Sequence, residues 1–195
     1  EYTNKMFHDY GIDQMLILSG SSPWYGMPNK LPDGEVAETG FLNYIRAQVT
    51  ELKGQIHCYE LMNETNAHKS ADWYARLTRG AYKIVKEIDP SITFVIGGTS
   101  GTPLEWLKEV MTKAEGCFDA VSIHPYGMNT SPEESKRYEA ILSVRELMNS
   151  CGAADKPITI SEMGWSTGWV SYEKQAAFNS QIYAIATSPE LGCDN

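Results

Sequence analysis

The chain has 195 residues, of which 42% are hydrophobic and 21% charged, enough for one domain with a sizeable core or for part of a larger domain. Its 25 acidic and 16 basic residues give a formal net charge of −9, so we expect neither nucleic acid nor an anionic membrane as a partner. The sequence contains no apolar run near the roughly 18 residues of a membrane span, and residues 1–5 do not open a signal peptide.

Short apolar runs recur along the chain and predict buried β-strands. They are QMLIL (14–18), QIHCYELM (55–62), TFVIGG (93–98), DAVSIHPY (119–126) and PITISEMGW (157–165). The spacing of 27 to 41 residues between strands leaves room for a helix in each connection, so the strands should be parallel.

Amphipathic helix patterns fill these connections. One lies within 41–52, a second over 73–88, and a third begins at Pro103, a favourable first-turn residue. Ser131 and Glu134 have capping-box spacing and predict a fourth helix that continues to Gly152. A fifth pattern follows Ser171. The glycine-rich stretch GGTSG (97–101) lacks the spacing of a phosphate-binding loop, which disfavours a nucleotide-binding open sheet.

Polar side chains follow several of the predicted strands at the point where each strand ends. Asn63 and Glu64 follow the second strand, His124 and Tyr126 end the fourth, and Glu162 lies in the fifth. In a parallel barrel these strand ends meet on one face, and two carboxylates across a cleft are what cleavage of a glycosidic bond requires. The alternative for Asn63 and Glu64 is the start of a helix, with Asn66 as its cap.

Three of these motifs together resemble the clan A glycoside hydrolases. CYELMNETN resembles their fourth-strand motif with its Asn-Glu pair, SIHPYG their sixth strand, and PITISEMGWST their seventh. Within the clan, the motifs are most similar to those of family 39-like enzymes, and less similar to those of families 5 and 53. The resemblance implies a (β/α)8 TIM barrel, of which this chain would cover roughly strands 3 to 7, with strands 1, 2 and 8 missing. Residues 1–195 would then form one partial catalytic domain.

The resemblance also implies a role for each matched residue. Glu64 would be the general acid and then the base, and Glu162 the nucleophile of a retaining hydrolase that cleaves β-glycosidic bonds of a plant or microbial glycan. Asn63 would bind the sugar 2-hydroxyl, Tyr126 would donate to Glu162, and His124 would order that neighbourhood or touch the substrate. Met62 and Thr65 depart from the family pattern, which has Trp and Pro at these places.

Aromatic residues after strand ends are candidates for stacking on sugar rings. We favour Trp24 and Trp165, and expect Trp73 and Trp106 to belong to the core because they fall on helix core faces. Glu60 should point into the barrel and pair with a buried cation.

Metal ligands and cofactors are not predicted. The four cysteines lack C-x-x-C spacing, and His8, His57 and His68 have no ligand partners at metal spacing. A disulfide among Cys117, Cys151 and Cys193 remains open.

The expected partner is an oligosaccharide or polysaccharide, in a secreted or periplasmic setting that fits this substrate class. The missing strands would come from a longer chain or from another subunit, because the sheet alone would expose its edges. Two other functions stay open at this stage. One is a catalytically incompetent barrel that binds carbohydrate or acts as a scaffold. The other is a barrel aldolase, which would need a lysine at a strand end, and no predicted strand end carries one.

Overall fold

The computed structural model of the protein describes residues 2–20 and 34–194, and its centre is a five-stranded parallel sheet. Each strand pairs with the next one in the sequence. The strands are β1 (Met15–Leu18), β2 (Cys58–Leu61), β3 (Thr93–Ser100), β4 (Ala120–His124) and β5 (Ile158–Ile160). Each overlaps one predicted strand segment, which confirms the predicted order and the parallel pairing.

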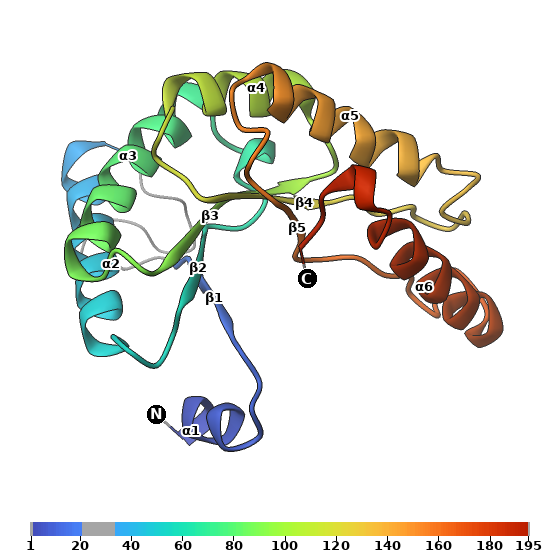
Figure 1. Ribbon diagram of the computed structural model, residues 1–195, viewed down its shortest axis with the longest axis horizontal. Coiled ribbons are helices and arrows are strands. Elements are labelled where there is room, and N and C mark those ends of the chain that lie inside the picture. Colours follow the sequence, from blue (N-terminus) through green and yellow to red (C-terminus); the bar gives the residue numbers. More distant parts are fainter. Residues whose placement is uncertain (1, 21–33, 195) are drawn as a thin grey trace.

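The helices alternate with the strands along the chain, and all except the first lie in an arc along one side of the sheet (Figure 1). They are α1 (Tyr2–Asp9), α2 (Glu35–Glu51), α3 (Ala71–Ile88), α4 (Leu104–Lys113), α5 (Arg137–Ser150) and α6 (Tyr172–Ala186), with the short 3-10 helices η2 (Thr65–Ala67) and η3 (Pro189–Leu191). From α2 to α6, each helix contacts the next. This alternation is that of part of a (β/α)8 barrel. None of the helices described is long and apolar enough to cross a membrane.

The capping box before α5 forms, but the helix begins later than predicted. The Ser131 hydroxyl accepts a hydrogen bond from the Glu134 amide at 3.1 Å, and the Ser131 amide donates to the Glu134 carboxylate at 2.9 Å. Lys136 then takes a left-handed backbone conformation with φ of 53°. A residue in this conformation interrupts a right-handed helix, so residues 132–136 form turns and α5 begins at Arg137.

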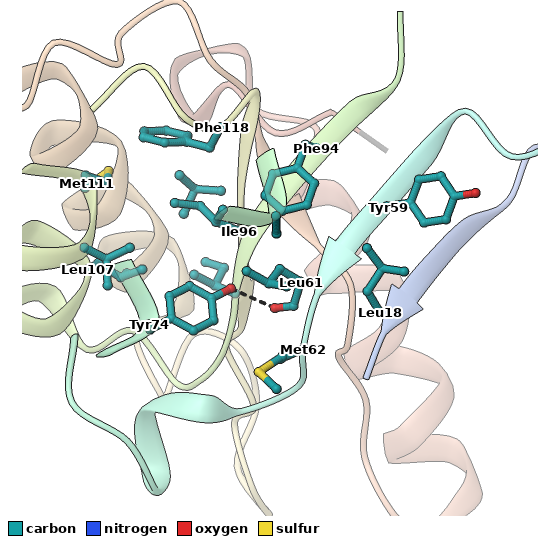
Figure 2. Close-up of a cluster of buried hydrophobic side chains, with 14 of the residues drawn as sticks. Leu18, Tyr59, Leu61, Met62, Tyr74, Phe94, Ile96, Leu107, Met111 and Phe118 are labelled. Carbon is teal, nitrogen blue, oxygen red and sulfur yellow. Dashed lines mark hydrogen bonds between the residues drawn. The ribbon is translucent and has the colours of Figure 1, made fainter. Parts of the chain in front are cut away.

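The core lies between the sheet and the helices, and Tyr74 of α3 ties the two layers together (Figure 2). Its hydroxyl donates to the Leu61 carbonyl of β2 at 2.7 Å and accepts from the Gly97 amide of β3 at 3.0 Å. Burial is the main cause that raises the pKa of this phenol above its usual value. Trp73 is buried in the core as predicted, and Trp106 is partly buried and packs against the core.

The register between β3 and β4 shifts between Ile96 and Thr99, where Gly97 and Gly98 have φ of 104° and 49°. A Cβ atom at Gly97 would lie 2.3 Å from the Ser122 carbonyl oxygen of β4. Glycine is therefore required here for both its backbone conformation and the close approach of β4. Residues 97–100 of the glycine-rich stretch, which has no phosphate-loop spacing, are the end of β3, and Gly101 follows the strand.

The segment after η3 pairs with β5. The Ile158 amide donates to the Gly192 carbonyl at 3.0 Å and the Asp194 amide donates to the Ile158 carbonyl at 2.9 Å, which makes a parallel bridge between Ile158 and Cys193. An eighth barrel strand is expected at this place in the sequence. All four cysteines are free thiols, so the structure contains no disulfide among Cys117, Cys151 and Cys193.

We predict that Gly97→Ala lowers the free energy of unfolding by about 3 kcal/mol, because the new methyl group meets the Ser122 carbonyl and the backbone is strained. Gly116→Ala is the control: it has a similar positive φ of 71° but open space around its Cβ position, and should cost about 1 kcal/mol. Equilibrium denaturant unfolding measures both. Equal losses would mean that the approach of β4 is not what requires glycine.

Candidate active site

Glu64, His124 and Glu162 meet at the edge of the sheet where the carboxyl ends of the strands lie, here called the carboxyl edge. Glu64 follows β2, His124 ends β4 and Glu162 follows β5. The His124 Nδ1 atom lies 3.3 Å from Glu64 Oε1 and 3.7 Å from Glu162 Oε2, and one ligand atom from each of the three residues lies within 4.8 Å of the others. Parallel strands bring these distant positions together because their ends share one edge.

The two carboxylates reach solvent, whereas the imidazole between them does not. The side chains of Glu64 and Glu162 are 35% and 37% exposed, and that of His124 is 0% exposed. A ligand that approaches from solvent can therefore contact both carboxylates, with His124 behind them.

The backbone that carries Glu64 is strained. Met62 and Glu64 both have left-handed conformations, with φ of 62° and 46°, which are uncommon for residues other than glycine. The Met62 amide donates to the Leu18 carbonyl at 3.0 Å and the Glu64 amide donates to the Gly98 carbonyl at 2.7 Å. Hydrogen bonds to the strands on either side thus hold the chain in a conformation that it would not adopt alone.

Asn66 fixes the same loop from the other side. Its side-chain carbonyl accepts from the Ser100 amide at 2.9 Å, and its amide group donates to the Ser100 carbonyl at 3.1 Å. The alternative that Asn66 caps the following helix is wrong, because the hydroxyl of Ser70 caps α3 by accepting from the Trp73 amide. Asn66 instead joins η2 to the end of β3.

Tyr126 contacts the second carboxylate. Its hydroxyl donates to Glu162 Oε2 at 3.1 Å. Burial, followed by the hydrogen bond and charge of Glu162 and the charge of Glu64, raises the pKa of Tyr126 above its usual value. We call Glu64, His124, Tyr126 and Glu162 the carboxylate cluster.

The other predicted site residues lie apart from these contacts. Asn63 is exposed and precedes Glu64 in the same loop. Trp24 lies outside the described residues. Trp165 is only 4% exposed: its indole N–H donates to the Thr130 carbonyl at 2.8 Å and its ring packs edge-on against Phe178 of α6, 5.5 Å between centroids. The ring is part of the packing between the loop after β5 and α6, so it does not offer the open face that we expected for a sugar.

Behind the carboxylate cluster lies a polar contact that the sequence analysis missed. Ser161 Oγ lies 3.0 Å from His124 Nε2 and 2.6 Å from Ser122 Oγ, and donates to Glu60 Oε1 at 2.9 Å. The expectation that Glu60 pairs with a buried cation is wrong, because among the described residues its partner is this hydroxyl. The signal available in the sequence was the position of Ser161 between the end of the strand and Glu162, which places its hydroxyl near the carboxyl edge.

Two carboxylates and an imidazole are also ligand types for divalent metals, and within residues 2–20 and 34–194 this is the group that comes close enough to share an ion. Their atoms already contact one another, Tyr126 and Ser161. We therefore describe them as a hydrogen-bonded cluster.

The fold and site together define part of a (β/α)8-barrel domain with its polar side chains collected at the carboxyl edge. Residues 57–190 match the family model described as glycosyl hydrolase catalytic core, and the chain belongs to this family. None of the curated protein sequences matches the chain.

Several solved structures that share this fold are described as glycosidases. A family 39 glycoside hydrolase from the gut symbiont Bacteroides cellulosilyticus WH2 superposes with a TM-score of 0.80 at 22% identity over 94% of this chain. A glucosidase from Croceicoccus marinus gives 0.71 at 17% identity over 96%, and a monomeric β-xylosidase from Caulobacter crescentus CB15 gives 0.67 at 20% over 87%. These likenesses confirm the partial barrel, and the family match over residues 57–190 confirms with them the predicted resemblance to clan A glycoside hydrolases. The chain spans 42%, 42% and 40% of these three structures.

We predict that Glu162→Gln lowers the pKa of Tyr126, because it removes a negative charge that opposes loss of the phenolic proton. The pKa should stay above its usual value, since burial is unchanged. NMR titration of ¹³C-labelled tyrosine, with the signal assigned by Tyr126→Phe, measures the shift. Glu190→Gln is the control: it should act on Tyr138, whose hydroxyl donates to Glu190 at 2.9 Å, and leave Tyr126 unchanged. An unmoved Tyr126 signal in Glu162→Gln would contradict the contact.

Proposed function

We propose that the protein is a retaining O-glycosyl hydrolase that cleaves β-glycosidic bonds of a plant or microbial glycan by double displacement. The observation that carries this proposal is the approach of Glu64 and Glu162, whose carboxylate oxygens lie within 4.8 Å of one another while both side chains reach solvent. Retaining glycosidases place their two carboxyl groups roughly 5 to 5.5 Å apart, whereas inverting enzymes need a wider gap for a water molecule.

In the first step the Glu162 carboxylate attacks the anomeric carbon and forms an ester bond to the sugar. The bond from this carbon to the leaving oxygen breaks, and the Glu64 carboxyl gives its proton to that oxygen. In the second step Glu64, now a carboxylate, takes a proton from water, and this water displaces Glu162 from the anomeric carbon. Both residues then regain their starting forms.

The neighbours of the two carboxylates support these roles. A nucleophile must stay ionised, and the Tyr126 hydroxyl donates a hydrogen bond to Glu162 that favours its charged form. Glu64 must alternate between acid and base, and it faces the imidazole of His124, a group that can accept or donate a hydrogen bond. Asn63, exposed beside Glu64, is the proposed ligand of the sugar 2-hydroxyl.

The substrate class follows from the chemistry and from the neighbours. A net charge of −9 suits an uncharged glycan better than a polyanion. The similar structures include a glucosidase and a β-xylosidase, so aryl β-xyloside and β-glucoside are the first substrates to test, with β-mannoside and β-galactoside beside them.

We predict that Glu64→Gln and Glu162→Gln each lower kcat/KM for the best aryl β-glycoside by about a thousandfold, since each removes a group that takes part in bond cleavage. Incubation with a 2-fluoro glycoside should trap the ester, and peptide mass spectrometry should find it on Glu162. Glu115→Gln, an exposed residue after α4, is the matched control and should keep full activity.

Two outcomes would overturn the proposal. The trapped sugar could be found on another residue, or wild type and Glu162→Gln could show the same absence of turnover on every glycoside. If the second outcome came with equal glycan affinity of both forms, the protein would be a carbohydrate-binding or scaffold domain.

A further inference from the structure

Glu60 of β2 is a buried carboxyl group that the proposed reaction does not use. It is 0% exposed, and its Oε1 atom accepts from Ser161 at 2.9 Å while Oε2 has no hydrogen-bond partner among the described residues. The backbone of β3 closes over it, since a Cβ atom at Gly98 would lie 3.0 Å from Oε1. Burying a carboxyl group in this way costs free energy, so the contact with Ser161 calls for an explanation.

Ser161 connects Glu60 to the carboxylate cluster, and a hydroxyl group has one proton and two lone pairs. The proton goes to Glu60 Oε1. The lone pairs are then left for the other two contacts, Ser122 Oγ at 2.6 Å and His124 Nε2 at 3.0 Å. With the Ser161 proton on Glu60, both of these partners act as donors, which puts a proton on His124 Nε2.

We propose that Glu60 and Ser161 are positioning residues that hold the proton of His124 on Nε2 and thereby keep Nδ1 as a hydrogen-bond acceptor. Glu60 takes the one proton of Ser161, Ser161 accepts from Nε2–H, and the lone pair of Nδ1 faces Glu64 Oε1 at 3.3 Å. The imidazole thus donates to Ser161 and Ser161 donates to Glu60, so the buried carboxyl group of β2 is joined to the carboxylate cluster by two hydrogen bonds.

The consequence for Glu64 rests on the proposed function. A neutral imidazole with an unprotonated Nδ1 can accept a hydrogen bond from the O–H of a Glu64 carboxylic acid, which keeps its proton and is the form that must protonate the leaving group. An Nδ1–H group would instead donate a hydrogen bond to the Glu64 carboxylate and stabilise this charged form, which has no proton to give to the leaving group. The donor-to-acceptor direction of these hydrogen bonds therefore favours Glu64, and not Glu162, as the general acid.

The ionisable groups that face His124 come from three strands. Glu64 after β2 and Glu162 after β5 lie 3.3 and 3.7 Å from Nδ1, Glu60 of β2 acts through Ser161, and Tyr126 after β4 reaches the ring only through Glu162. The ring itself is fully buried. The test must therefore read the ring nitrogens directly.

The first test is the long-range ¹H–¹⁵N NMR spectrum of the intact protein with labelled histidine, which distinguishes the two neutral tautomers. Wild type should give the Nε2–H pattern for His124, with the signals assigned by His124→Gln. Ser161→Ala removes the acceptor, so the ring should shift toward Nδ1–H. Ser122→Ala is the matched control: it deletes a hydroxyl that touches Ser161 but not the ring, and should keep the Nε2–H pattern.

The second test uses leaving groups of different acidity. A dinitrophenyl glycoside departs without a proton, whereas an alkyl or disaccharide substrate needs one. Ser161→Ala should therefore lower kcat/KM about tenfold for the poor leaving group and change it less than about twofold for dinitrophenolate. A general loss of packing would lower both equally, and so would count against the positioning role.

A third variant, Glu60→Leu, removes the acceptor of Ser161 while filling the space with apolar atoms, a kind of change that buried polar sites often tolerate. It should shift the His124 spectrum in the same direction as Ser161→Ala. An Nε2–H pattern that survives in both variants would overturn the proposal. Because the NMR result does not depend on turnover, it stands even if the protein proves not to hydrolyse glycosides.

Discussion

The parallel register of β2 to β5 is the constraint on which the site depends. It places the end of β2 beside the end of β3, and the end of β4 beside β5, so that Glu64 and His124, 60 positions apart in the sequence, come into contact. Tyr74 fixes this register from the helix layer by bonding β2 and β3 with a single hydroxyl. The register between β3 and β4 shifts at Gly97, where β4 approaches β3 too closely for any side chain.

Much of this arrangement could be predicted from the sequence because strand ends and helix faces leave periodic patterns. The strand order, the helix layer and the approach of Glu64 and Glu162 follow from these patterns and from the geometry of parallel strands. The left-handed Met62 and Glu64 could not be predicted, since no glycine marks them and only their bonds to neighbouring strands explain them. The orientation of Trp165 depends on α6, a distant contact that local sequence does not encode.

The wrong expectation for Glu60 shows how a buried carboxyl group can be accommodated without a cation. Sequence reasoning assigned it a charged partner, since buried acids are usually paired. The structure instead gives it a serine hydroxyl whose neighbour is an imidazole, so that its influence passes to the carboxylate cluster through two hydrogen bonds. The pattern of the strand locates such a group inside the sheet, but the identity of its partner depends on β5, a separate part of the chain.

The two left-handed residues before η2 have a consequence for how this protein would change under selection. Met62 and Glu64 each keep a conformation that glycine or asparagine would adopt with less strain. Laboratory evolution for thermal tolerance alone, with no demand for catalysis, would therefore favour replacements at these two positions early. A screen for heat resistance would therefore replace the candidate acid. The rise in melting temperature on replacing Glu64 would measure how much stability this protein loses by keeping Glu at that position.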